Sequence, residues 1–175
     1  LGPKIPTTAL NYCTELWLAQ PFDFKITRTR NTCLGNYRFH KGRHAITVNH
    51  DLNTYNFLIT YLHEVAHLQV QLNYGNKGRR VMPHGREWKM AFQKLMIPLL
   101  NETTFPLDVL KPLAAHLINP KASSTRDPLL LNALRKHNIG QENALTLREI
   151  ASNSRFSFKN KHFVKLKARR TRALC

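Results

Sequence analysis

The sequence predicts a fold of the α+β class, in which a small antiparallel sheet and several helices occupy separate stretches of one chain. Apolar residues recur at helical spacing in several segments, and three short segments near the N-terminus have the period-two or β-branched pattern of strands. Glycine and proline punctuate the segments as turns. With 175 residues, of which 42% are hydrophobic, the chain can bury a core.

The first half of the chain predicts a helix, three strands and a longer helix. Residues 8–20 carry apolar side chains at helical spacing. Turn signals at Gly35 and Gly42 separate strands that we expect to form an antiparallel meander over residues 22–30, 34–40 and 43–49. The longest helical pattern covers residues 52–74, and Asn53 or Thr54 can cap its start.

The second half begins with a loop over residues 75–83, which contain two glycines and a proline, and continues with a helix that ends near Leu100. Pro106 and Pro112 predict short helical turns or loops between residues 101 and 119. A short helix is expected over residues 129–137. These patterns predict three parts of the chain, which are a domain of residues 1–118, a linker of residues 119–128 and a basic C-terminal region of residues 129–175.

The charge is strongly positive, because 27 Lys and Arg oppose 10 Asp and Glu to give a formal charge of +17. Such an imbalance favours a polyanionic partner, with nucleic acid ahead of an anionic membrane surface, although a merely basic surface is the alternative. Cys13, Cys33 and Cys175 form no C-x-x-C pair, which argues against a disulfide framework. No stretch is long and apolar enough for a membrane span. We therefore expect a cytoplasmic protein, nucleoid-associated if bacterial.

The residues His63, Glu64 and His67 form an H-E-x-x-H pattern inside the longest predicted helix. Positions i and i+4 lie on one face of a helix, so both imidazoles can reach one metal ion. Glu64 is rotated away from that face and can instead accept a proton from water that zinc has activated. The alternative is a charged outer helix face, but the apolar neighbours indicate a buried helix, where unpaired His and Glu would be costly.

A catalytic zinc site needs a third protein ligand. His84 lies 17 residues after His67, at the start of the next predicted helix, and Glu87 in that helix is the rival. Together, the H-E-x-x-H helix, the loop and the H-G-x-x-W pattern of His84, Gly85 and Trp88 resemble the SprT-like metallopeptidase family over residues 8–100. The resemblance implies a zincin-like domain with one catalytic Zn²⁺ on His63, His67 and His84, Glu64 as general base, Trp88 packed behind the site, and the strand of residues 45–49 bordering the substrate cleft.

Many members of that family carry a C-terminal zinc ribbon with two cysteine pairs, whereas this chain has only Cys175 there. We expect a zinc-ribbon-like β element that is either degenerate or truncated. Phenylalanines alternate in it with the cations that we expect to contact DNA, which are Arg155, Lys159, Lys161, Lys165, Lys167, Arg169, Arg170 and Arg172. The alternative is a strand whose phenylalanines face a core and whose cations face water.

These features predict a zinc-dependent endopeptidase that is DNA-associated and acts on DNA-bound or crosslinked proteins, with an extended substrate lying alongside the strand of residues 43–49. One alternative is a non-catalytic protein linked to transcription that binds zinc and nucleic acid. Glu64 argues against it, because a structural zinc site needs no base beside its ligands. A peptidase for soluble proteins, whose charge is incidental, is the third hypothesis.

Overall fold

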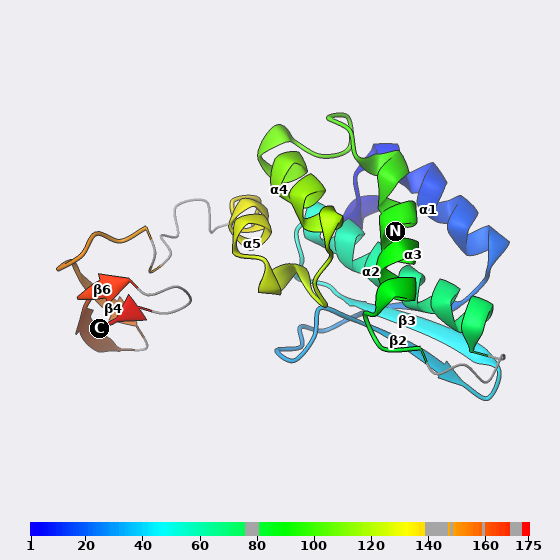
Figure 1. The fold of residues 1–175 in the computed structure, drawn as a ribbon, viewed down its shortest axis with the longest axis horizontal. Coiled ribbons are helices and arrows are strands. Elements are labelled where there is room, and N and C mark those ends of the chain that lie inside the picture. The colour runs from blue at the N-terminus through cyan, green and yellow to red at the C-terminus, as the bar shows by residue number, and fades with distance from the viewer. Residues whose placement is uncertain (76–80, 139–146, 148, 159, 169–172) are drawn as a thin grey trace. The chain divides into compact units, whose positions relative to one another are not determined.

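The computed structural model describes residues 1–75, 81–138, 147, 149–158, 160–168 and 173–175. The chain divides into two compact units, Leu1–Ile139 and Gly140–Cys175 (Figure 1). The segment predicted as a linker, residues 119–128, lies inside the first unit. Within the described residues, no helix is long and apolar enough to cross a membrane.

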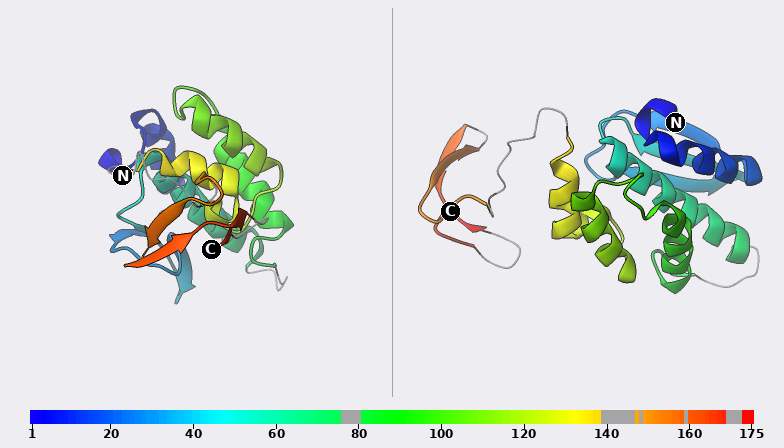
Figure 2. Two further views of the ribbon diagram at one scale, coloured as in Figure 1. Left: turned by 90° about the vertical axis from the view of Figure 1, so that its left-hand side faces the viewer. Right: turned by 90° about the horizontal axis from the view of Figure 1, so that it is seen from above.

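The first unit is a mixed α+β structure, as predicted, with one three-stranded sheet and five α-helices among its described residues. The helices gather on one face of the sheet (Figures 1 and 2). In chain order the elements are η1 (Gly2–Lys4), α1 (Thr7–Ala19), β1 (Asp23–Thr27), β2 (Gly35–His40), β3 (Arg43–Asn49), α2 (Thr54–Tyr74), α3 (Arg86–Met96), η2 (Ile97–Leu99), α4 (Leu107–Ile118), η3 (Ser124–Arg126) and α5 (Pro128–Arg135).

The sheet has the strand order β1-β3-β2, so the expected antiparallel meander is wrong in one respect. Strands β2 and β3 form an antiparallel hairpin whose two turn residues, Lys41 and Gly42, have φ of 48° and 75°. These two positive values are those of a type I′ turn. Strand β1, however, pairs with β3 in parallel. Because both sides of β3 are occupied, β3 cannot pair with a substrate strand, and β1 and β2 are the two edge strands.

Asn49 explains how the chain crosses from β1 to the far side of β3. Its buried amide donates from Nδ2 to the carbonyl oxygens of Arg30 at 3.2 Å and Cys33 at 2.9 Å. Its Oδ1 accepts from the Arg30 Nε at 2.8 Å. The connection of residues 28–34 is therefore held across the end of β3. The two-residue period of a strand does not report which strands are neighbours, so sequence pattern could not show this arrangement.

Helix α2 is the centre of the core, with most residues between Phe57 and Leu68 buried. Ile46 and Val48 of β3 lie in the same core, and the Tyr61 hydroxyl donates to the Cys13 carbonyl of α1 at 3.3 Å. The Asn53 side chain accepts from the Asn56 amide, which caps the start of the helix as predicted. The residues of the H-E-x-x-H pattern thus lie in a helix that is packed on several sides.

Helix α4 is continuous over 12 residues, so the prediction of only short helical turns or loops between residues 101 and 119 is wrong about the length of this element. Pro106 occupies the N-cap position, where its missing N–H costs nothing, and Pro112 is tolerated inside the helix. Val109, Leu113 and Leu117 bury one face at a spacing of four residues. Tertiary packing of this face outweighs the local cost of the internal proline.

Residues 119–128 connect α4 to α5 through η3, and Asp127 fastens them to both helices. Its Oδ2 lies 3.1 Å from the Nδ1 of the buried His116 of α4. Its Oδ1 accepts from the amides of Leu129 and Leu130 and so caps α5. The segment is therefore held as part of the first unit.

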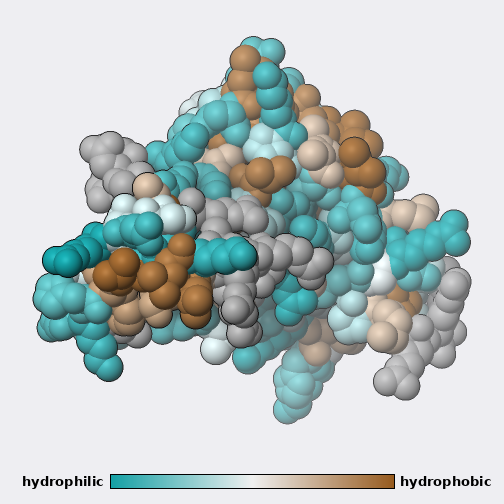
Figure 3. Space-filling model, turned by 60° about the vertical axis from the view of Figure 1, so that its left-hand side comes forward, coloured by the Kyte–Doolittle hydropathy of each residue, from teal (hydrophilic) through white to brown (hydrophobic). Residues whose placement is uncertain are grey.

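The second unit consists, in its described residues, of two small antiparallel hairpins: β4 (Arg155–Phe158) with β5 (Lys161–Val164), and β6 (Lys167–Ala168) with β7 (Ala173–Leu174). The Phe156 and Phe163 rings stack with centroids 5.5 Å apart. Lys165 is buried, and its Nζ donates to the Ile150 carbonyl. Exposed apolar side chains, among them Phe158 and Leu166, give this unit a hydrophobic surface bordered by hydrophilic residues (Figure 3).

Candidate metal centre

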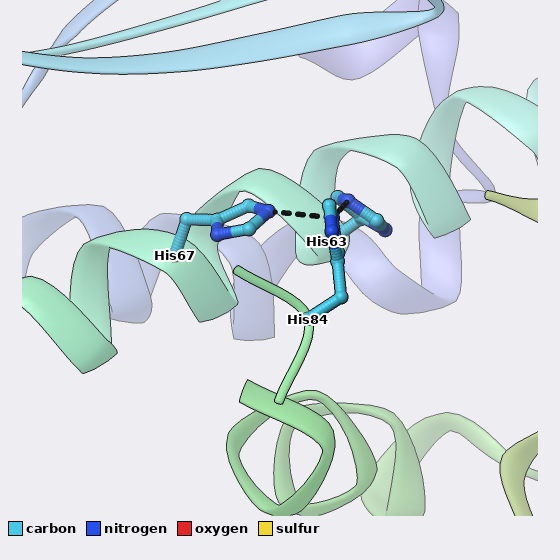
Figure 4. A group of neighbouring side chains, drawn as sticks. All are labelled: His63, His67 and His84. Atoms are coloured by element: carbon cyan, nitrogen blue, oxygen red, sulfur yellow. Dashed lines mark hydrogen bonds between the residues drawn. The ribbon is translucent and has the colours of Figure 1, made fainter. Parts of the chain in front are cut away.

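Three histidine side chains from two separate segments converge beside α2. His63 and His67 are one helical turn apart on α2, and His84 precedes α3. The Nε2 of His84 lies 3.0 Å from the Nε2 of His63 and 3.0 Å from that of His67 (Figure 4). One ligand atom from each residue lies within 4.8 Å of the others, so the group could hold a metal ion. Glu87, the rival third ligand, is not part of this group of described residues.

A tight turn brings His84 into place. Its φ is 56°, in the left-handed region that a residue other than glycine enters at a cost of roughly 1 kcal/mol or more. The following Gly85 donates its amide to the Met82 carbonyl, and a Cβ added to Gly85 would lie 2.9 Å from that carbonyl oxygen. Only glycine fits there without a shift. The H-G pair therefore has a structural reason, since it turns the chain sharply enough to aim the imidazole back at α2.

Trp88 lies behind all three imidazoles. It is 1% exposed, and its ring centroid is 4.5 Å from that of His63, 4.7 Å from His84 and 5.6 Å from His67. Its indole N–H donates to the His63 carbonyl oxygen at 3.3 Å, and the Phe92 ring stacks on the indole with centroids 5.0 Å apart. Trp88 thus ties α3 to α2 at the level of the site and restricts the orientations of the imidazoles.

Burial keeps the three imidazoles in the neutral form that a metal ligand requires. Desolvation lowers the pKa of His63 well below its usual value and the pKa of His67 to about 4, and the other imidazoles of the cluster add to the effect. The pKa of His84 is also lowered, first by burial and then by the positive charge of Arg126. Three neutral imidazole nitrogens that converge are a donor set that fits zinc.

Glu64 is 6% exposed and lies under strand β2. Burial raises the pKa of its carboxyl group to about 8, although a hydrogen bond from the Tyr37 backbone N–H and the charge of Arg30 oppose the rise. Gly35 is the reason that β2 can approach so closely, because a Cβ there would lie 2.6 Å from Glu64 Oε1. A carboxylate whose pKa lies near neutrality can both accept and release a proton.

Two cavities meet at the histidines and follow the edge strand β2. The larger, of about 700 Å³, is lined by Glu64 and all three histidines, by residues 30–36 and by residues 122–126 of the segment that contains η3. The smaller, of about 370 Å³, lies beside His67, His84 and Tyr37 and extends toward the end of α2. Together they form a cleft that reaches past the candidate metal centre on both sides.

Sequence reasoning missed several residues of this cleft, namely Arg30, Gly35, Tyr37 and Arg126. Gly35 carried a signal that we interpreted only as a turn. The others lie far from the H-E-x-x-H pattern in the chain, and no local pattern marks them. Their positions depend on the strand order and on the packing of the segment after α4.

The fold and the site define a class of protein, namely an α+β domain in which three histidines that can hold a metal flank a buried glutamate in an open cleft. A model of the SprT-like family matches residues 11–109, more than half of the chain, and the chain belongs to that family. This confirms the resemblance drawn from the motifs. No curated protein and no solved structure matches the chain.

Proposed function

We propose that this protein is a zinc-dependent endopeptidase. The observation that carries the proposal is the position of Glu64, buried at the floor of the cleft beside the three converging histidines. A site that only holds a metal has no need of a carboxylate kept there against a desolvation cost. Membership of the SprT-like family supports the same conclusion.

His63, His67 and His84 would hold one zinc ion, which, when bound, supplies Lewis acidity toward a carbonyl group and toward water. The chain's own residues perform the proton transfers. Glu64 takes a proton from the attacking water and delivers it to the amine that leaves. Tyr37 orients Glu64 through its backbone N–H, and Trp88 keeps the imidazoles in place.

The edge of β2 is the place for an extended substrate. In an antiparallel pair, alternate residues direct their backbone groups away from the partner strand. Leu34 and Asn36 are engaged with β3, so the backbone groups of Gly35, Tyr37 and Phe39 point toward the open edge. This edge runs beside both cavities. A substrate strand that pairs with it would carry its scissile bond past the histidines.

Substitution of Glu64→Gln tests the proposal directly. Wild type and variant should each bind one zinc ion per chain, and only the wild type should cleave casein or a histone, because general base catalysis contributes roughly 10²–10⁴-fold. Cleavage by the variant at the wild-type rate would refute the role of Glu64. If both bind zinc and neither cleaves any protein, the alternative of a non-catalytic protein that binds zinc and nucleic acid is the better account.

We also propose that the protein is DNA-associated and acts on DNA-bound or crosslinked proteins. Phe156, Phe158, Phe163 and Lys161 share one face of the β4–β5 hairpin, and Phe158 is 61% exposed. Such a face can stack on bases while cations contact phosphates. Of the predicted DNA contacts, the exposed ones are Arg155, Lys161 and Lys167. Lys165 is buried within the unit, and Lys159, Arg169, Arg170 and Arg172 lie outside the described residues.

Affinity for single-stranded DNA, measured as a function of salt, tests this association. Phe158→Ala should weaken binding by about 10-fold without changing the salt slope, because it removes stacking alone, whereas Lys161→Gln should lower the slope by about one unit. Leu129→Ala, an exposed change on α5, is the matched control. Unchanged affinity in both hairpin variants would remove the hairpin from the proposal. We also propose that the protein is cytoplasmic, and nucleoid-associated if the source is bacterial.

A further inference from the structure

The larger cavity of the cleft has a cationic lining. Among the described residues that line it, Arg30 and Arg126 carry positive charge, and Glu64 is the carboxylate. Among the described residues, the smaller cavity on the other side of the histidines is lined by side chains without a formal charge, such as Tyr37, Val70, Met82 and Trp88. Among the described residues, the cationic side chains of the cleft therefore lie in the larger cavity.

Arg30 belongs to the connection between β1 and β2 and is held in the wall by two residues of β3. Its Nε donates to Asn49 Oδ1 at 2.8 Å and its Nη1 to Thr47 Oγ1 at 3.1 Å. The Nη2 atom is buried and has no hydrogen-bond partner within the described residues. A guanidinium N–H without a partner costs free energy unless an acceptor reaches it. The charge of Arg30 also acts on Glu64, where it opposes the rise in pKa that burial causes.

Arg126 is at the end of η3, across the cavity from the sheet. It belongs to the segment between α4 and α5, which Asp127 fastens through His116 and the start of α5. This segment lies beyond the residues that the family model matches. Its exposed guanidinium is near enough to the histidines for its charge to lower the pKa of His84. Two cationic side chains from separate segments of the chain, Arg30 and Arg126, thus line one cavity.

We propose that this cavity is a subsite for a carboxylate of the substrate, with Arg126 as the residue that determines the preference and Arg30 as a second cation. The carboxylate is either an acidic side chain or the free C-terminus of the substrate chain. The cavity adjoins the start of β2, so a substrate antiparallel to β2 places residues on the C-terminal side of the scissile bond there. Arginine guanidinium groups match carboxylates in geometry and charge.

This inference rests on the proposed function, since it names a substrate class for the same site. Peptide binding to the full-length, zinc-loaded Glu64→Gln protein tests it without requiring cleavage. Four peptides of equal length are compared. Two carry glutamate or glutamine on the C-terminal side of the central bond, and two carry glutamate or glutamine on its N-terminal side. Each peptide is prepared with a free and with an amidated C-terminus.

We expect glutamate on the C-terminal side to bind about 10-fold more tightly than glutamine, and Arg126→Gln in the same background to abolish the difference. If the chain end is the carboxylate instead, peptides with a free C-terminus should bind about 10-fold more tightly than amidated ones, whichever of glutamate and glutamine they carry, and Arg126→Gln should abolish that difference. Arg126→Glu should reverse the preference in favour of lysine. Arg135→Gln, an exposed arginine of α5 that does not line the cavity, should keep the wild-type preference.

Equal binding of glutamate and glutamine peptides together with equal binding of free and amidated ones would overturn the inference, and so would a preference that survives both Arg126 substitutions. So would a preference confined to the N-terminal side. The two proposals fail in different ways. Cleavage by the wild type without a preference for acidic peptides removes the subsite alone, whereas the preference in binding without any cleavage removes the peptidase and leaves the carboxylate site.

Discussion

A methyl group on Gly35 would stand 2.6 Å from Oε1 of Glu64 and 2.8 Å from Cγ2 of Thr60. Strand β2 therefore lies directly on α2 at the position of the motif glutamate, with nothing larger than a hydrogen atom between them. This close approach allows the Tyr37 N–H to reach the Glu64 carboxylate and leaves the edge of β2 beside the three histidines.

Gly35→Ala should lower the free energy of unfolding by about 1–3 kcal/mol, because the added methyl group overpacks a buried contact. It should also reduce peptide cleavage, since Glu64 must shift away from β2. Chemical denaturation and cleavage assays measure the two effects. Gly2→Ala is the control, because nothing lies within 4 Å of a Cβ at Gly2. Equal stability and activity in both variants would show that β2 moves freely away from α2.

The metal-free protein should lose stability relative to Glu64→Gln as the pH rises. In the folded protein the pKa of Glu64 is about 8, above its ordinary value of 4.5. The stability that the protonated carboxyl group contributes is therefore complete below about pH 4.5 and is lost as the pH rises through 8. Between pH 5 and pH 8.5 the loss in the free energy of unfolding, relative to Glu64→Gln, amounts to roughly 4 kcal/mol. Urea denaturation with a chelator between pH 5 and pH 8.5 measures it. The histidine contributions are common to both proteins, and a pH-independent difference would contradict the burial of an ionisable carboxyl group.

His84→Ala should weaken zinc binding by at least roughly a hundredfold, since loss of even an outer-shell contact to a ligand costs 10–100-fold. Glu87→Gln should leave the affinity unchanged, because Glu87 is not among the converging groups. Competition with a chromogenic chelator measures both affinities. The opposite order would make Glu87 the third ligand.

Trp88→Phe should weaken zinc binding by about 10-fold, because it removes the indole N–H that holds the His63 carbonyl. Trp17 offers a matched comparison, since its indole N–H also donates to a backbone carbonyl, that of Phe22, at 3.0 Å. Trp17→Phe should cost about 1 kcal/mol of stability and leave zinc affinity unchanged. Similar zinc affinities in the two variants would mean that Trp88 only packs.

The residues of the candidate metal centre could be predicted because each lies in a local pattern. Helical geometry dictates that His63 and His67 share a face, and His84 is followed by the glycine that its turn requires. The long helix and its Asn53 cap were predicted for the same reason, since capping and periodicity act within a few residues. The length of helix α4 was underestimated, because the burial of Val109, Leu113 and Leu117 outweighs a local proline signal.

By itself, then, the sequence determined the α+β class, the family and the residues that can hold a metal, because these depend on spacing over one or two helical turns. Only the tertiary structure decided that β1 runs parallel to β3, that β2 is the edge beside the site, and that residues 122–126 form a wall of the cleft. Strand order and cleft walls arise from contacts between distant segments, such as those of Asn49 with Arg30 and Asp127 with His116. No periodicity along the chain records such contacts.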